Sequence, residues 1–241
     1  MPALARTPAE SLRDIHADVW QADALASAAQ QVQATGSAEL DAQLPGGGWP
    51  VGALTEILQP ASVHCEWRLL LPALSQCGQG TVVLVAPPYV PFAPALAAQG
   101  LAAHRLLSVR VEPADARLWT CEQALRCADV DAVLAWLPQV RSEQLRRLQM
   151  AAAEYSKLLF VVRPAAAFAD ASPAALRLRI QPAAPDALQR APFGPQTGGM
   201  LEIRLLKRRG PPFDKPLHVQ ACPPPMQVQL ASAQHHALDC A

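Results

Sequence analysis

The sequence has no net charge and no close pair of cysteines. Its 241 residues include 20 Lys and Arg against 20 Asp and Glu, so only a local basic patch could attract nucleic acid. The six cysteines form no C-x-x-C pair, which argues against a structural zinc site. Most of them lie in apolar or helical segments, which favours reduced thiols and a cytoplasmic location.

Charged residues are missing from Leu69 to Ala103, a stretch long enough to suggest a membrane span. A proline inside a helix costs about 3 kcal/mol, and prolines interrupt this stretch at Pro72, Pro87, Pro88, Pro91 and Pro94. We therefore expect a buried helix–strand–helix unit and no membrane contact. The N-terminus carries charges and has no apolar core, so it does not resemble a signal peptide.

Apolar runs of strand length alternate with segments of helical period over most of the chain. The predicted strands are Ala53–Leu58, Thr81–Ala86, Leu106–Val111, Ala132–Leu137 and Leu158–Val162. The predicted helices are Val63–Gln76, 91–99, 114–126 and 142–155. This alternation predicts an α/β fold with a doubly wound, mainly parallel sheet.

The pattern changes from Leu176 onward, where no helix separates the strands. Leu176–Ile180, Met200–Leu206 and Leu217–Val219 predict an antiparallel C-terminal extension, with a proline-rich loop at 182–198. We divide the chain into an N-terminal helical extension (1–33), a core domain (34–222) and a disordered tail (223–241) that lacks any apolar period.

The N-terminal extension carries apolar residues at helical spacing, namely Leu12, Ile15, Val19 and Trp20. Such spacing predicts one apolar helix face. That face either packs on the protein's own core or docks on a partner. Trp20 is therefore a candidate partner contact.

The segment after the strand Ala53–Leu58 has the layout of a phosphate-binding loop without its chemistry. Such a loop reads G-x-x-x-x-G-K-[ST], and its backbone N–H groups surround a phosphate at the start of a helix. Here Gln59 and His64 occupy the glycine positions, Cys65 the lysine position and Glu66 the hydroxyl position. The loop is degenerate, and we expect it to bind no cofactor.

Several segments resemble the ATPase core of the RecA recombinase. Thr35 to Asp41, with TG followed by LD, and the GGWP-x-G turn up to Gly52 are similar to its entry. LPGGGWP at Leu44–Pro50 and LLKRRGPPF at Leu205–Phe213 resemble the ImuA family, the RecA-like accessory proteins of bacterial translesion synthesis, sometimes labelled SulA-like. The resemblance implies a RecA-like core over about 34–220.

Within this resemblance, three further positions have lost their chemistry. Pro87 stands where the family has a water-activating glutamate, Trp136 where it has a metal-binding aspartate, and Pro164 where a glutamine senses the γ-phosphate. ATP hydrolysis needs a phosphate cradle, a metal and a positioned water. The resemblance therefore implies no enzyme, no metal and no catalytic residue, with weak nucleotide binding in another pose as the alternative.

The densest basic run is Lys207, Arg208 and Arg209. It is either a solvated face or a contact for DNA phosphates or an acidic partner. In RecA-like proteins two loops bind single-stranded DNA. Their counterparts here, Pro138–Arg141 and Ala165–Ser172, are short and carry only Phe168 as an aromatic, which argues against single-strand binding by these loops.

The family resemblance implies a non-catalytic accessory protein of SOS-induced translesion DNA synthesis, in the DNA damage response and induced mutagenesis. The implied partners are a polymerase-like translesion protein of the Y family and the error-prone replicative DNA polymerase subunit, with RecA and DNA as further candidates. The alternatives are a DNA-dependent ATPase of the RecA class and a SulA-like cell-division inhibitor.

Overall fold

The computed structural model describes residues 31–183 and 200–220. The predicted N-terminal helix with Trp20, most of the loop 182–198 and the predicted tail 223–241 lie outside the described residues. Among the described residues, no helix is long and apolar enough to cross a membrane.

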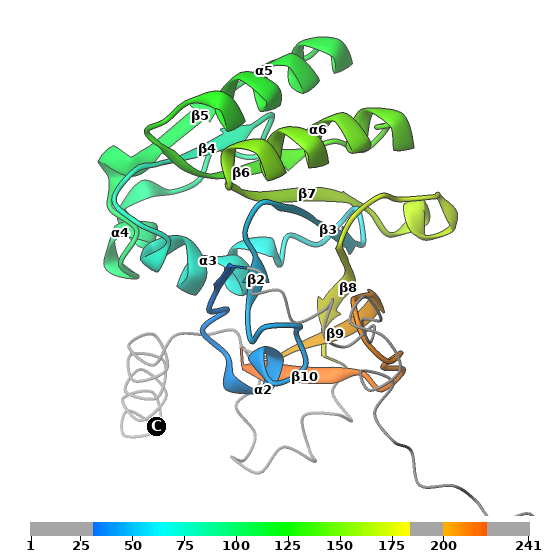
Figure 1. Ribbon diagram of the computed structural model, residues 1–241. Coiled ribbons are helices and arrows are strands. Elements are labelled where there is room, and N and C mark those ends of the chain that lie inside the picture. Colours follow the sequence, from blue (N-terminus) through cyan, green and yellow to red (C-terminus); the bar gives the residue numbers. More distant parts are fainter. Residues whose placement is uncertain (1–30, 184–199, 221–241) are drawn as a thin grey trace, which may run out of the picture.

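A large sheet of eight strands forms the centre of the molecule, in the order β10-β9-β8-β3-β7-β6-β4-β5 (Figure 1). Its strands are β3 (Ala53–Gln59), β4 (Thr81–Val85), β5 (Leu106–Val109), β6 (Val130–Trp136), β7 (Leu158–Pro164), β8 (Leu176–Pro182), β9 (Met200–Lys207) and β10 (Leu217–Gln220). Neighbouring strands from β8 to β5 are parallel. The predicted α/β class with a mainly parallel sheet is confirmed.

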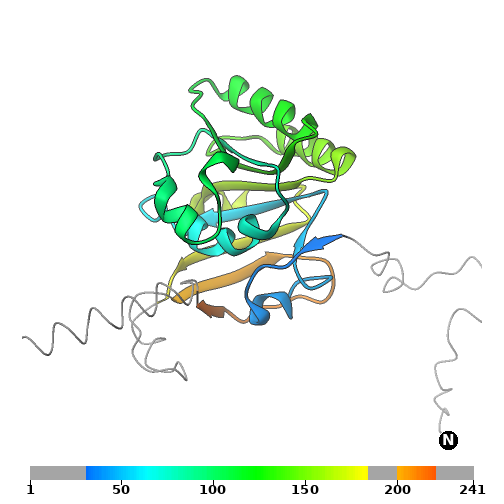
Figure 2. The same ribbon diagram turned by 90° about the vertical axis from the view of Figure 1, so that its left-hand side faces the viewer.

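Helices cover both faces of the parallel strands (Figures 1 and 2). One face packs against α3 (Glu66–Gln76) and α4 (Ala93–Ala98). The other packs against α5 (Ala114–Arg126) and α6 (Ser142–Tyr155). The predicted helix 142–155 coincides with α6, whereas α3 begins three residues later than predicted, because Val63–Cys65 still belong to the preceding loop.

The prediction for the strand at Leu176 was wrong in part. β8 pairs antiparallel with β9 but parallel with β3, so it is the last strand of the parallel sheet. The chain crosses from β7 to β8 through a short 3₁₀ helix, η3 (Ala165–Ala169), and passes over β3. An alternating pattern reveals a half-buried strand but not the direction of its neighbours. The antiparallel extension therefore consists of β9 and β10 joined to β8.

The LPGGGWP turn has a structural role. It leads into β2 (Trp49–Pro50), which pairs with β1 (Val32–Gln33) beside the main sheet. A Cβ atom at Gly48 would lie 2.4 Å from the carbonyl oxygen of Gln33, so only glycine fits this close approach. The fully buried Trp49 then packs edge-on against Phe160 of β7, with ring centroids 5.5 Å apart.

The connections that follow β4 and β6 create a crevice at the carboxyl ends of these two strands. β4 is followed by α4 on one face, whereas its neighbour β6 is followed by α6 on the other face. At such a switch point the chain leaves adjacent strands in opposite directions, and open α/β sheets bind their ligands there, outside the carboxyl ends of the strands. We call the side of the sheet where the parallel strands end the carboxyl edge, and the side where they begin the amino edge.

Candidate functional site

In the degenerate phosphate loop, residues 59–66, side chains take up the space and the hydrogen-bond donors that a phosphate would need. The Gln59 amide oxygen accepts a hydrogen bond from the Cys65 N–H at 3.2 Å. Its amide nitrogen donates to Oε2 of Glu66 at 2.6 Å, and both side chains are buried. A backbone donor that a phosphate loop would offer to a ligand is therefore engaged inside the protein.

Glu66 is the first residue of α3. The start of a helix favours negative charge, because its first N–H groups lack helical partners and the helix dipole points there. The buried Glu66 carboxylate supplies that charge, and His64 Nδ1 lies 3.7 Å from its Oε1. Burial raises the pKa of the Cys65 thiol, so this residue stays neutral at the position where a phosphate loop has a lysine.

A cavity of about 630 Å³ opens next to this loop at the carboxyl ends of β3, β4, β6 and β7. Its lining includes five positions that the resemblance links to nucleotide chemistry: Gln59, His64, Pro87, Trp136 and Pro164. The structure thus brings together residues that the sequence analysis singled out separately. Cys65 and Glu66 are buried next to the lining rather than part of it.

The cavity wall contains a strained residue and an unpaired donor. Ala86, directly after β4, has a φ of 52°, which costs a residue other than glycine about 1 kcal/mol. The Nε1 group of the buried Trp136 has no hydrogen-bond partner within the described residues. Both features are enriched at sites where function is favoured over stability.

An exposed apolar loop after β4 continues the chain from Pro87 and Pro88 of the cavity wall, and we call its exposed residues the rim. Tyr89, Val90 and Phe92 are 70%, 62% and 71% exposed. The ring of His64 contacts Tyr89 edge-on at 4.9 Å between centroids, which joins this loop to the degenerate phosphate loop. The sequence analysis missed this rim, although Tyr89 and Val90 stand between the prolines of PPYVPF, where a continuous helix or strand is disfavoured.

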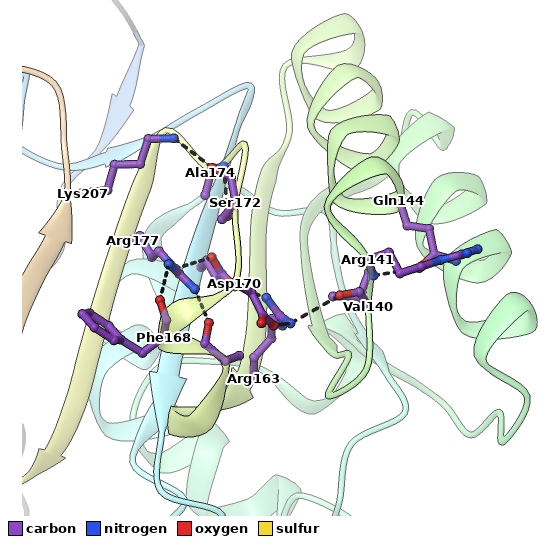
Figure 3. Close-up of polar contacts among 12 residues, drawn as sticks. Val140, Arg141, Gln144, Arg163, Phe168, Asp170, Ser172, Ala174, Arg177 and Lys207 are labelled. Atoms are coloured by element: carbon purple, nitrogen blue, oxygen red, sulfur yellow. Dashed lines mark hydrogen bonds and ion pairs between the residues drawn. The ribbon is translucent and has the colours of Figure 1, made fainter.

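A buried ion network supports the loops of the carboxyl edge (Figure 3). Glu56 on β3 is fully buried and lies 2.7 Å from both Arg163 on β7 and Arg177 on β8. Arg163 also pairs with Asp170 at 2.7 Å and donates to the Val140 carbonyl at 3.3 Å.

Arg177 completes this support. It donates to the carbonyl of Phe168 at 3.0 Å and to that of Ala167, both in η3. The loops after β6 and β7 are therefore fixed by buried arginines rather than left open around a ligand. The sequence signal for this network was a glutamate and an arginine inside otherwise apolar strands.

The basic run at Lys207 is partly used by the fold. Lys207 donates to the Ser172 carbonyl at 3.0 Å, next to the loop after β7 (Figure 3). The Arg208 guanidinium lies over Phe213 and donates to the carbonyls of Gln43 and Pro211. Carbonyl partners do not neutralise the charges of Lys207 and Arg208, so positive charge stays at the C-terminal end of β9.

The remaining predicted contact residues are less informative. Arg209 is exposed, and Trp20 lies outside the described residues. Among the residues that the structure describes, no group of three or more His, Cys, Asp and Glu side chains could hold a metal.

Comparison of the sequence with models of known protein families gives no match. Comparison with curated proteins gives none either. Assignment of a function therefore depends on the residues and on the geometry of the carboxyl edge.

Proposed function

We propose that this protein is a non-catalytic RecA-like accessory protein of SOS-induced translesion DNA synthesis. It acts in the cytoplasm through contacts with other proteins, and DNA is a second candidate ligand. The observation that carries the non-catalytic part is the degenerate phosphate loop: Gln59 and Glu66 occupy the donor and the helix terminus that a nucleotide phosphate would need.

The cavity chemistry supports the same reading. Phosphoryl transfer needs charge neutralisation by a metal and a positioned water. Proline at 87 and 164 and tryptophan at 136 offer no metal ligand and no base for that water. An α/β protein whose cavity lacks this chemistry is better suited to binding a partner than to hydrolysing ATP.

The proposed partners are a Y-family polymerase-like protein, the error-prone replicative polymerase subunit and RecA. Lys207 supports contact with an acidic surface, because its ammonium is exposed and its partner is a neutral carbonyl. An exposed cation of this kind contributes little to stability, so it is available for a partner at small cost to the fold.

The test is genetic. In a bacterium that carries this gene, deletion is expected to lower the number of mutants that arise after DNA damage, and the wild-type gene to restore it. Lys207→Glu is expected to restore less, whereas Arg146→Glu, an exposed position on α6, serves as the matched control. An unchanged mutation frequency in the deletion strain contradicts the proposal, and filamentous cells on overexpression would favour the cell-division alternative.

A further inference from the structure

We propose that the cavity at the carboxyl edge is a docking pocket for a short acidic peptide of a partner protein. The peptide places an aromatic or leucine side chain in the cavity and a carboxylate beside Arg110 and Arg117. This goes beyond the proposed function, but it rests on one part of it, namely that the cavity no longer takes a nucleotide.

The walls of the cavity favour an apolar occupant. Its lining combines the indole of Trp136 with Val111, Val162 and five prolines, Pro60, Pro87, Pro88, Pro138 and Pro164. Burial of apolar area in such a site is the main driving force for association. A volume of about 630 Å³ lies within the range of pockets that bind small ligands, so it holds an anchor side chain together with its neighbours.

The exposed rim extends this apolar surface toward a partner. Tyr89, Val90 and Phe92 follow the cavity wall directly in the chain and are more than half exposed. Aromatic residues of this kind dominate the energy of protein interfaces. Because Pro87, Pro88 and Pro91 restrict the backbone, less conformational entropy is lost when a partner binds.

Charge on the cavity wall selects an acidic peptide over a basic one. Arg110 is exposed, and the half-buried Arg117 is fixed beside the cavity by a 2.9 Å hydrogen bond from its Nε to the Val111 carbonyl. Among the described residues of the lining, the acidic side chain is Glu112, and Arg163 is already paired with Glu56 and Asp170. Two arginines against one glutamate leave a positive wall.

The strained Ala86 connects β4 to the proline wall of the cavity and to the aromatic residues that follow it. Its left-handed conformation turns the chain from β4 into the prolines of the wall, and its N–H donates to the Val109 carbonyl at 2.9 Å. The turn thus carries both the apolar wall and the aromatic rim. Strain held at a binding site is consistent with a preformed pocket.

The experiment selects a random peptide library displayed on phage against the full-length protein. The expected consensus combines an aromatic or leucine anchor with Asp or Glu within two residues. The consensus peptide, labelled with a fluorophore, is then titrated by fluorescence polarisation. Enrichment of basic peptides, of peptides without an anchor, or of no sequence at all overturns the proposal.

Variants locate the site. Tyr89→Ser combined with Phe92→Ser is expected to weaken binding at least about tenfold, whereas Met150→Ser, an equally exposed apolar residue on α6, changes nothing. Arg110→Glu is expected to weaken the acidic peptide and to favour a copy with lysines in place of its acids. Equal affinity for all variants overturns the docking site.

Mg-ATP and a single-stranded oligonucleotide serve as competitors. Neither is expected to displace the peptide. Displacement by Mg-ATP would show that the cavity is a nucleotide site, which contradicts the premise shared with the proposed function, namely that the cavity no longer takes a nucleotide. Failure of the peptide selection without any ATP binding overturns the docking pocket alone, so the two failures are distinguishable.

Discussion

The two edges of the parallel sheet are both braced by buried arginine, yet they end in different surfaces. At the amino edge, Arg105 is 4% exposed and donates to the Gly80 carbonyl at 2.8 Å. Asp131 on β6 accepts the Gly80 N–H at 2.6 Å and lies 3.3 Å from Arg105. These groups satisfy one another and close the space between the starts of β4 and β6.

At the carboxyl edge, the network around Glu56 holds the loops but leaves a cavity open. Beside that cavity lie the strained Ala86, the unpaired indole N–H of Trp136 and the exposed Tyr89 and Phe92. Similar buried ion pairs therefore close the sheet at one edge and support loops beside an exposed surface at the other. Variants at the two edges should therefore separate stability from binding.

The largest expected effect comes from Glu56→Gln. Removing one partner of a buried ion pair costs about 3–5 kcal/mol, because the remaining charges stay buried without compensation. Here Arg163 and Arg177 would both lose their shared carboxylate. Urea unfolding monitored by circular dichroism measures the loss. The control is Glu122→Gln, which breaks a pair with the exposed Arg147 and should cost less than about 1 kcal/mol; equal losses would refute the role of Glu56.

Arg105→Met should destabilise the protein by a smaller amount, about 2–3 kcal/mol, because Asp131 and the Gly80 carbonyl lose a charged partner. Asp131 is partly solvated, with a side chain 25% exposed, which limits the penalty. Affinity for the peptide consensus should stay unchanged at temperatures where the variant is folded. A clear loss of peptide affinity in the folded variant would mean that the amino edge also determines binding at the carboxyl edge.

Among the residues that the structure describes, two that are not glycine have a left-handed backbone. They are Ala86 at the carboxyl edge and Ser156 at the end of α6, just before the start of β7 at the amino edge. Replacement of either by glycine should stabilise the protein by up to about 1 kcal/mol, because relief of strain exceeds the added chain entropy. Only Ala86→Gly should also weaken peptide binding, since it loosens the cavity wall. Thermal melts measure the stability, and polarisation titrations measure the peptide affinity. Weaker peptide binding by Ser156→Gly would show that the effect on binding is not confined to the carboxyl edge.

The smallest effect concerns cysteine alkylation by iodoacetamide at about pH 8. A thiol at an unfilled helix N-terminus is activated, but burial and the Glu66 carboxylate raise the pKa of Cys65. Peptide mass mapping of the native protein should therefore find Cys65 protected and the exposed Cys127 modified. Glu66→Gln should speed the labelling of Cys65. If Cys65 of the wild type is labelled as fast as Cys127, Gln59 and Glu66 do not occupy the degenerate phosphate loop as described.

Much of the fold was predictable, because local pattern determines it. The β-branched run of β4 and the apolar period of α6 are visible in the sequence, and so is the lack of phosphate-binding residues after β3. The partners of buried charges were not, since Glu56 and Arg163 are 107 residues apart. The direction of β8 depends on its neighbours rather than on its own residues.

The candidate site was predictable in part. The sequence identified Gln59, His64, Pro87, Trp136 and Pro164 as altered positions, but only the strand order brings them to one cavity. The exposure of Tyr89 and Phe92 runs against their apolar character, and the sequence signal for it is confined to the prolines beside them. Likewise, a basic run gives no sign that Arg208 binds carbonyls of its own chain.

The central claim is that the carboxyl edge presents a binding surface and performs no nucleotide chemistry. Phosphate release from Mg-ATP, with and without single-stranded DNA, tests it most directly. The account predicts no release above the level of a protein-free sample. Cys65→Lys alone should not create any, because Pro87 and Trp136 offer no ligand at the positions that the RecA resemblance assigns to the water and the metal. DNA-stimulated release that Cys65→Ala abolishes would contradict it.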